Sequence, residues 1–189
     1  MIKKTTKQIS VYNAPTLEDE ILLLRPLKIS DAKMCVTAGW KNQYSKPITT
    51  IEQAKSYLKH ISKKADGYYV GVFLKENNQL IGDLELCHLQ WFDDQAGEIC
   101  YGIHKDYRGK GYATRASSIL IDYLFNKIGL HKIYADTDPN NLASQKVLTK
   151  LGFKQEGRIR DKRMIDGKWI DEIDYGLLKT EWKNSYKKK

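Results

Sequence analysis

Apolar residues in the second half of the chain follow a helical period in two places. Between Ala116 and Leu124 they fall at positions i, i+3, i+4, i+7 and i+8, which share one helix face. A second helix is expected after the turn at 138–141, with Ser144 and Leu151 on one face and Gly152 at its end. Apolar runs predict strands between and after these helices, over 132–136, 153–160 and 169–179.

The first half of the chain is patterned mainly as strands. Residues 68–75 and 79–89 predict a hairpin closed by the turn at 76–78, and a further strand is expected over 98–104. An earlier strand is expected over 21–24, ended by Arg25 and Pro26.

Two helices are expected near the N-terminus. Ser30 and Asp31 predict an N-cap for a helix to about Gly39, and Thr49 and Glu52 have capping-box spacing for a helix over 51–63. Antiparallel strands followed by strand–helix–strand–helix–strand predict an α/β (α+β) domain, with a mixed, mostly antiparallel twisted sheet and helices on both faces.

Length and composition fit one globular domain. The 189 residues are 41% hydrophobic and 29% charged, and no apolar run approaches the roughly 18 residues of a membrane span. We expect a loose tail over 1–15, the domain over 16–183 and a basic tail over 184–189. No apolar stretch follows the first lysines, so a signal peptide is not expected and a cytoplasmic location is.

The cysteines and histidines give no sign of a metal site. Cys35, Cys87 and Cys100 are odd in number and lie in apolar segments, which predicts buried free thiols in a reducing compartment. The four histidines, at positions 60, 88, 104 and 131, have no ligand spacing.

The formal net charge of +9 is unevenly distributed. Residues 76–104 hold six acids and no Lys or Arg, so the rest carries +15 from 32 basic and 17 acidic residues. Such a chain can hold an anionic ligand beside a cationic one. It also fits a nucleic-acid-binding module, although we find no RNA-recognition signature.

The main chemical motif is a glycine-rich turn between a predicted strand and the helix at 116–124. Residues 106–114 read Asp-Tyr-Arg-Gly-Lys-Gly-Tyr-Ala-Thr, and glycine N–H groups beside a helix N-terminus form an anion site suited to a pyrophosphate. Gly111 follows Lys110 where a P-loop requires Gly-Lys-Ser/Thr, and Thr114 replaces the third glycine of a dinucleotide fingerprint.

Arg108-x-x-Gly111-x-Ala113 resembles the Arg/Gln-x-x-Gly-x-Gly/Ala signature of the GNAT acetyltransferases. The stretch from Asn141 to Phe153 resembles the second signature of that superfamily. Residues 24–27 with Asp31 resemble the ribosomal-protein acetyltransferase branch, and 107–116 also resemble spermidine acetyltransferases. The three matches stand in family order over about residues 20–182.

The resemblance implies an enzyme that uses acetyl-CoA as cosubstrate and needs no metal. The backbone from Tyr101 through Gly102 to Ile103 would pair with the pantetheine arm like an added strand. The N–H groups of the turn would hold the pyrophosphate, and Asn141 would bond the pantetheine or its phosphate end. The turn residues implied are Arg108, Gly109, Lys110, Gly111, Tyr112 and Ala113.

Two residues are candidates for catalysis. Glu98 resembles a catalytic base of some family members, and alternation places it on one strand face with Cys100 and Gly102; a solvent-facing acid is the alternative. Many relatives carry a Tyr acid where this chain has Leu148. Ser144, on the same helix face, could protonate the leaving sulfur instead, or simply bond back to its own helix.

The acceptor is expected to be an amine. The ribosomal branch favours a protein or peptide α-amine, with docking on the ribosome through a basic face; the acidic 76–104 segment supports a polyamine. A non-catalytic acetyl-CoA sensor is the alternative of another class. A homodimer is compatible with the sequence.

Asp83 and Glu85 could bind a cationic acceptor, but simple exposure is the stronger expectation. The aromatic residues that could shape a pocket are Trp40, Tyr44, Trp91 and Phe92.

Overall fold

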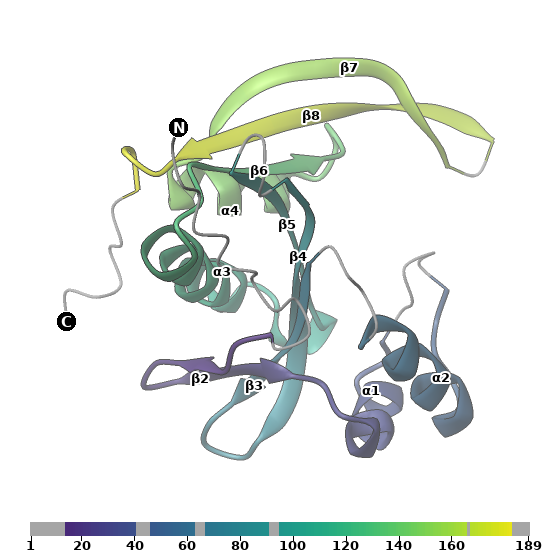
Figure 1. Cartoon of the computed structure of the whole chain (residues 1–189). Coiled ribbons are helices and arrows are strands. Elements are labelled where there is room, and N and C mark those ends of the chain that lie inside the picture. Colours follow the sequence, from purple (N-terminus) through teal and green to yellow (C-terminus); the bar gives the residue numbers. More distant parts are fainter. Residues whose placement is uncertain (1–13, 41–45, 63–66, 91–94, 166, 183–189) are drawn as a thin grey trace, which may run out of the picture.

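The computed structural model describes residues 14–40, 46–62, 67–90, 95–165 and 167–182, which form one eight-stranded sheet in the order β1-β2-β3-β4-β5-β6-β8-β7 (Figure 1). Neighbouring strands are antiparallel except β5 and β6, so the prediction of a mixed, mostly antiparallel sheet is confirmed. The strands are β1 Leu17–Glu18, β2 Leu22–Pro26, β3 Tyr68–Leu74, β4 Gln79–Gln90, β5 Ala96–Ile103, β6 Lys132–Thr137, β7 Lys154–Ile165 and β8 Lys168–Leu178.

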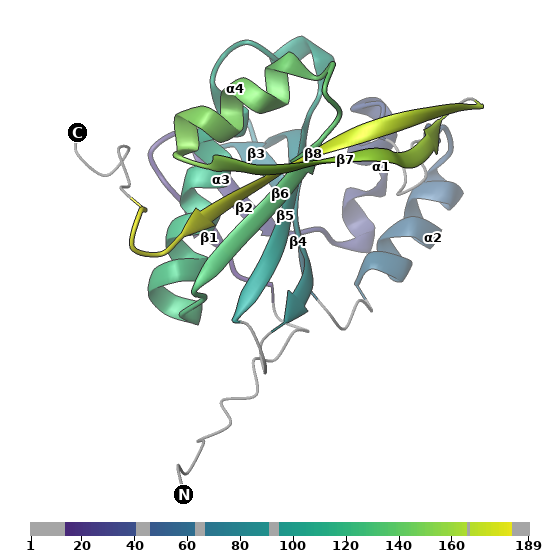
Figure 2. The same ribbon diagram turned by 90° about the horizontal axis from the view of Figure 1, so that it is seen from above.

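Helices cover both faces of the sheet, as predicted (Figures 1 and 2). Helices α1 (Ala32–Thr37) and α2 (Ile51–Ile61) lie on one face, and α3 (Tyr112–Tyr123) and α4 (Leu142–Leu151) lie on the other. Short turns of other helical types cover Ile29–Asp31, Lys105–Tyr107 and Leu124–Ile128. No helix in the described part of the chain is long and apolar enough to cross a bilayer.

Each helical layer buries its own apolar cluster against the sheet. Leu120, Ile121 and Leu124 are fully buried between α3 and the strands, which is why the apolar period of this segment is helical. On the opposite face, Leu58 of α2 packs in a smaller cluster with Phe73 of β3.

Helices α1 and α2 begin where the sequence predicts, but their capping contacts differ from those expected. Thr50, not Thr49, caps α2: its hydroxyl accepts the N–H of Gln53 at 3.2 Å, and the Gln53 side chain accepts the Thr50 N–H at 3.3 Å. A glutamine closes the box as well as the expected Glu52 would, so the motif is displaced by one residue.

Asp31 is not a side-chain N-cap for α1. Its carboxylate is held by the guanidinium of Arg25 at 2.7 and 3.0 Å and by the backbone N–H of Lys28 at 2.7 Å. This contact ties β2 to the first helical turn. It also helps to explain why β2 continues through Arg25 to Pro26, past the predicted end of that strand.

Among the described strands, the sheet opens at the one parallel pair. β5 and β6 pair over Ala96–Glu98 and Lys132–Tyr134, and residues 99–103 of β5 have no strand partner on that side among the described residues. We call this opening the fork. It leaves backbone groups of β5 available to a ligand, beside the glycine-rich turn.

Candidate active site

The turn between β5 and α3 has the geometry of an anion site. Gly109 and Gly111 adopt positive φ angles of 76° and 81°, and a Cβ at either position would meet nothing within 4 Å. No side chain caps α3, which begins at Tyr112. Among the described residues, the first N–H groups of this 12-residue helix therefore have no side-chain cap, and at this end the helix dipole favours negative charge.

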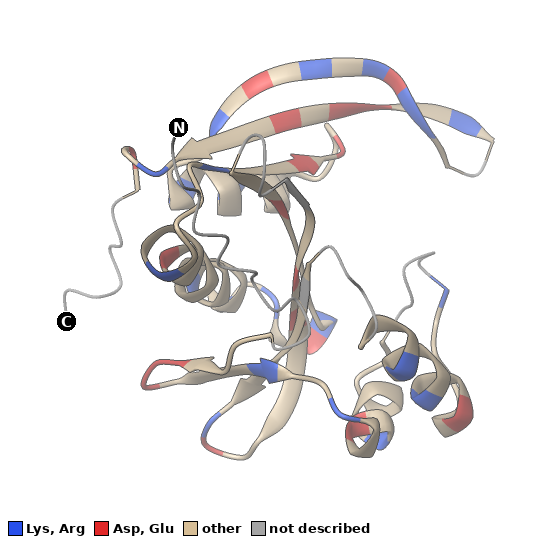
Figure 3. Cartoon of the chain, viewed as in Figure 1, with Lys and Arg blue, Asp and Glu red and all other residues tan. Residues whose placement is uncertain are grey.

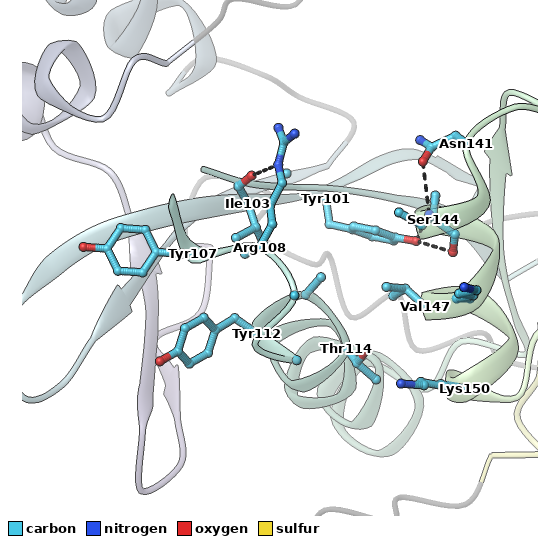
Figure 4. A pocket seen from close by; sticks show the side chains of 16 residues that line it. Tyr101, Ile103, Tyr107, Arg108, Tyr112, Thr114, Asn141, Ser144, Val147 and Lys150 are labelled. Carbon is cyan, nitrogen blue, oxygen red and sulfur yellow. Dashed lines mark hydrogen bonds between the residues drawn. The ribbon is translucent and has the colours of Figure 1, made fainter. Parts of the chain in front are cut away.

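A cavity of about 470 Å³, which we call the loop cavity, lies between this turn, the end of β5 and helix α4 (Figure 4). Arg108 fixes the turn to the strand, because its Nε donates to the Ile103 carbonyl at 2.8 Å. Lys146 and Lys150 of α4 line the opposite wall. Glycine backbone and three cationic side chains fit the phosphates of a coenzyme A ligand.

The expected cofactor residues gather around the loop cavity. Nine of the ten line it, and Lys110 does not; its ammonium lies 5.3 Å from the centre of the Tyr107 ring. Lys146 and Lys150 were missed: their spacing of four residues places them on one side of α4, but that side differs from the face of Ser144 and Leu151 on which the prediction was based. The nine are Tyr101, Gly102, Ile103, Arg108, Gly109, Gly111, Tyr112, Ala113 and Asn141.

Ser144 forms a hydroxyl pair with Tyr101. The two oxygens lie 2.8 Å apart across the loop cavity, and the Tyr101 hydroxyl also lies 3.3 Å from the Ser144 carbonyl oxygen (Figure 4). Burial raises the pKa of Tyr101 to about 12, so the phenol stays protonated near neutral pH. The side chain of Asn141, expected to contact the ligand, accepts the Ser144 N–H at 3.1 Å as the N-cap of α4.

The other face of β4 and β5 is acidic. Asp83, Glu85 and Cys87 of β4 pair with Gly102, Cys100 and Glu98 of β5, so the five side chains of these six residues share one face, as alternation predicts. All three acids come from the acidic 76–104 segment, and Figure 3 shows acidic residues on these central strands.

A second cavity of about 590 Å³ lies on this face, and we call it the aromatic cavity. It shares Arg108 and the last strand residues, Tyr101 to Ile103, with the loop cavity, so the two meet at the end of β5. Its other lining residues include Trp40, Tyr57, Tyr69, Asp83 and Glu85.

Asp83 is held within the aromatic cavity, so the expectation of simple exposure was wrong. The Tyr69 hydroxyl donates to its carboxylate at 3.0 Å, and Trp40 donates to Tyr69 at 3.3 Å. Burial raises the pKa of Asp83 to about 7. A Cβ at Gly102 would lie 3.1 Å from Asp83 Oδ1, so the absence of a side chain there leaves room for the carboxylate.

Glu98 lies in a third cavity of about 640 Å³ beneath the β7–β8 hairpin, which we call the hairpin cavity. Its carboxylate contacts His88 Nδ1 at 2.7 Å, and burial raises its pKa. Glu98 lines neither the loop cavity nor the aromatic cavity, so the structure does not bring it together with Ser144. Of the predicted aromatic residues, Tyr44, Trp91 and Phe92 fall outside the described ranges.

The thiols differ from expectation. Cys35 is buried as predicted, but Cys87 is half-buried and Cys100 is exposed. Cys100 lies on the open acidic face of β5, which the apolar character of the surrounding segment did not reveal.

Comparison with known proteins identifies the family. A model described as an acetyltransferase (GNAT) domain matches residues 22–154. The chain therefore belongs to the GNAT acetyltransferases, and it is an acetyl-CoA-dependent N-acyltransferase. The fork, the uncapped α3 and the loop cavity fit the cosubstrate that this class uses.

Individual relatives divide by acceptor. An uncharacterised N-acetyltransferase of Bacillus licheniformis is 32% identical over 88% of this chain and 98% of its own length. The crystal structure of a ribosomal-protein-S5-alanine acetyltransferase from Vibrio fischeri superimposes with a TM-score of 0.75 at 30% identity, covering 90% of this chain and 100% of that one. Spermidine N(1)-acetyltransferase of Escherichia coli is 28% identical over 72% of each chain.

Proposed function

We propose that this enzyme acetylates the α-amine at the N-terminus of a protein or peptide by direct attack in a ternary complex. The observation that carries the proposal is the meeting of the loop cavity and the aromatic cavity at Tyr101–Ile103. Two ligands approaching from opposite faces of β5 could meet there without a covalent enzyme intermediate. The thioester supplies the activated acetyl group.

We assign the acceptor site to the aromatic cavity and the base to Asp83. An incoming ammonium must lose a proton before it can attack, and a base with a pKa near 7 suits that task at neutral pH. An α-amine, with a pKa near 8, is neutral in roughly one molecule in ten at pH 7, so modest help suffices. Glu98, the base expected from the sequence, remains the alternative.

The loop cavity offers the complementary groups. A backbone N–H near Gly102 or Ile103 would stabilise the developing oxyanion. The Ser144 hydroxyl, hydrogen-bonded to the protonated Tyr101 phenol, would protonate the departing sulfur. The arrangement replaces the tyrosine that many relatives carry at the position of Leu148.

A polyamine is the second candidate acceptor, because the row of carboxylates on the acidic face of β4 and β5 suits a chain of ammonium groups. Asp83 and Glu85 line the aromatic cavity, and Glu98 and Asp136 line the adjoining hairpin cavity. Both cavities include Cys100, so an extended ligand could reach from one to the other. This continuity also accommodates the residues that follow the N-terminus of a peptide.

The test is thioester loss from acetyl-CoA with free-N-terminal peptides, the same peptides N-acetylated, and spermidine. Turnover with free peptides alone supports the proposal, and turnover with spermidine alone favours the second candidate. CoA binding without turnover on any amine would reassign the chain as a sensor. Asp83→Asn and Glu98→Gln, compared on the active substrate, decide which carboxylate is the base.

A further inference from the structure

The hairpin cavity holds a cluster of side chains of the types that bind metal ions. The proposed acetyl transfer gives this cluster as a whole no role. A sulfur of Cys87, a ring nitrogen of His88 and a carboxylate oxygen of Glu98 all lie within 4.8 Å of one another. The Cys100 sulfur is not part of this mutually close set, but it lies 3.7 Å from that of Cys87 and 3.9 Å from Glu98 Oε1. All four residues line the same cavity wall.

A backbone irregularity brings the histidine to this cluster. Cys87 and His88 are consecutive residues of β4, and in a regular strand their side chains would point to opposite faces. The register between β4 and β5 shifts between Cys87 and Gln90, and His88 has a positive φ of 49°. This φ is unfavourable for a residue with a Cβ, and here it turns the imidazole toward Glu98.

Two of the distances between these side chains can be compared with those around a tetrahedral ion. With bonds of about 2.3 Å to sulfur and about 2.0 Å to nitrogen, zinc separates two sulfur ligands by about 3.8 Å. The two cysteine sulfurs already lie 3.7 Å apart. The distance between His88 Nδ1 and Glu98 Oε2 is now 2.7 Å, as in a hydrogen bond. It would increase to about 3.4 Å when each atom binds the ion instead.

We propose that Cys87, His88, Glu98 and Cys100 form a binding site for one zinc ion. Two thiolates and an imidazole favour zinc over magnesium or calcium, which prefer oxygen ligands. The two thiol protons leave to solvent as the bonds form, and no oxidation is involved. The exposure of His88 and Cys100 gives the ion a path from solvent.

The site has a consequence for the acidic face. Cys100 lines both the hairpin cavity and the aromatic cavity, so an ion at the cluster fixes a residue at the junction of the two. The ion would also bind the Glu98 carboxylate. It would therefore narrow the passage between the hairpin cavity and the aromatic cavity, and leave the loop cavity unchanged.

The test uses the tag-free, full-length protein, freed of metal and kept reduced with a non-thiol reductant, and titrated with Co²⁺ as a spectroscopic substitute. We expect one ion per chain, a thiolate-to-cobalt charge-transfer band, the visible spectrum of a tetrahedral ion, and loss of both signals on adding Zn²⁺. Cys87→Ser, Cys100→Ser and His88→Asn should each weaken binding by at least about tenfold. Asparagine tolerates the positive φ of position 88.

Matched controls use the same residue types away from the cluster. Cys35→Ala and His60→Asn should bind Co²⁺ like the unchanged protein. Thermal stabilisation by CoA, retained in every variant, would show that the fold persists. A Co²⁺ spectrum without a thiolate band, or a band unaffected by both cysteine variants, would overturn the proposal whatever the outcome of the acetylation assay.

Discussion

At the scale of single residues, the position of Asp83 between Tyr69 and Gly102 has the largest consequences. The carboxylate accepts a hydrogen bond from Tyr69 at 3.0 Å and lies in the cavity that adjoins the loop cavity. We predict that Asp83→Asn lowers kcat/KM by about tenfold for a peptide α-amine near pH 7, because roughly one such amine in ten is neutral without a base, and by about 100-fold or more for spermidine. Steady-state kinetics with saturating acetyl-CoA measure it.

The control for this prediction is Glu85→Gln, which removes a negative charge from the same strand face, two residues away. We expect it to change kcat/KM for the peptide by less than about threefold. Equal losses in both variants would mean that the face acts through its total charge, and Asp83 would then not be the base.

The raised pKa of Asp83 also makes stability depend on pH. Its folded-state pKa of about 7 lies above the ordinary value of 3.8, so folding favours the protonated form. The contribution to stability is complete below pH 4 and is lost as the pH rises to about 7. Asp83→Asn should therefore gain stability relative to the unchanged protein between pH 5 and pH 8, measured by urea unfolding. A constant difference across that range would contradict this.

The hydroxyl pair of Tyr101 and Ser144 allows a second prediction. Ser144→Ala should lower kcat by about 10- to 100-fold, since the leaving sulfur would lose its proposed proton donor. The Kd for CoA, measured by calorimetry, should change by less than about threefold, because the phosphate contacts remain. Thr149→Ala is the control: that hydroxyl lies on the same helix and donates to the Gln145 carbonyl at 2.8 Å. An unchanged kcat in Ser144→Ala would remove Ser144 from the mechanism.

The sequence predicts residues whose chemistry is local and misses those created by packing. Gly109, Gly111 and Ser144 belong to short motifs, so their places follow from the strand–turn–helix pattern. Asp83 owes its burial to Tyr69 and to Trp40, which comes from another part of the chain. Nothing in the neighbourhood of Asp83 in the sequence encodes that contact.

At the scale of elements, two glycine turns allow the cost of backbone strain to be measured apart from the loss of CoA binding. Gly111 and Gly167 have φ angles of 81° and 76°, and each has open space where a Cβ would stand. Alanine at either position should cost roughly 1–2 kcal/mol of stability. Only Gly111→Ala should also weaken CoA binding, because Gly167 lies in the β7–β8 turn. Equal CoA affinity in the two variants would exclude the turn from the phosphate site.

The succession of elements from β2 onward followed from the sequence, whereas the two-residue strand β1 was not predicted and the ends of the elements depended on contacts that the sequence does not display. The helical period of 116–124 identified α3. The capping of α2 was misplaced because Thr49 and Thr50 both offer a hydroxyl, and the observed box uses Gln53. The bulge that turns His88 toward Glu98 depends on cross-strand register, which apolar alternation does not reveal.

At the scale of the whole molecule, the loop cavity joins elements from both sides of the fork, so ligand binding should stabilise the entire fold. At a CoA concentration 100 times its Kd, the stability should rise by about 2.7 kcal/mol, which corresponds to a Tm increase of about 5–11 °C. Adenosine, which lacks the pyrophosphate, should shift the Tm much less. A CoA shift no larger than that of adenosine would argue against phosphate binding at the glycine turn.

The fork has a further consequence for the ladder of backbone hydrogen bonds. The sheet consists of a five-stranded part ending at β5 and a three-stranded part beginning at β6, joined by three pairs of residues. If the pantetheine arm pairs with residues 99–103, the cosubstrate is itself a temporary strand of the sheet. Amide hydrogen exchange in that segment should then slow on CoA binding, and each catalytic cycle would make and break part of the protein's own secondary structure.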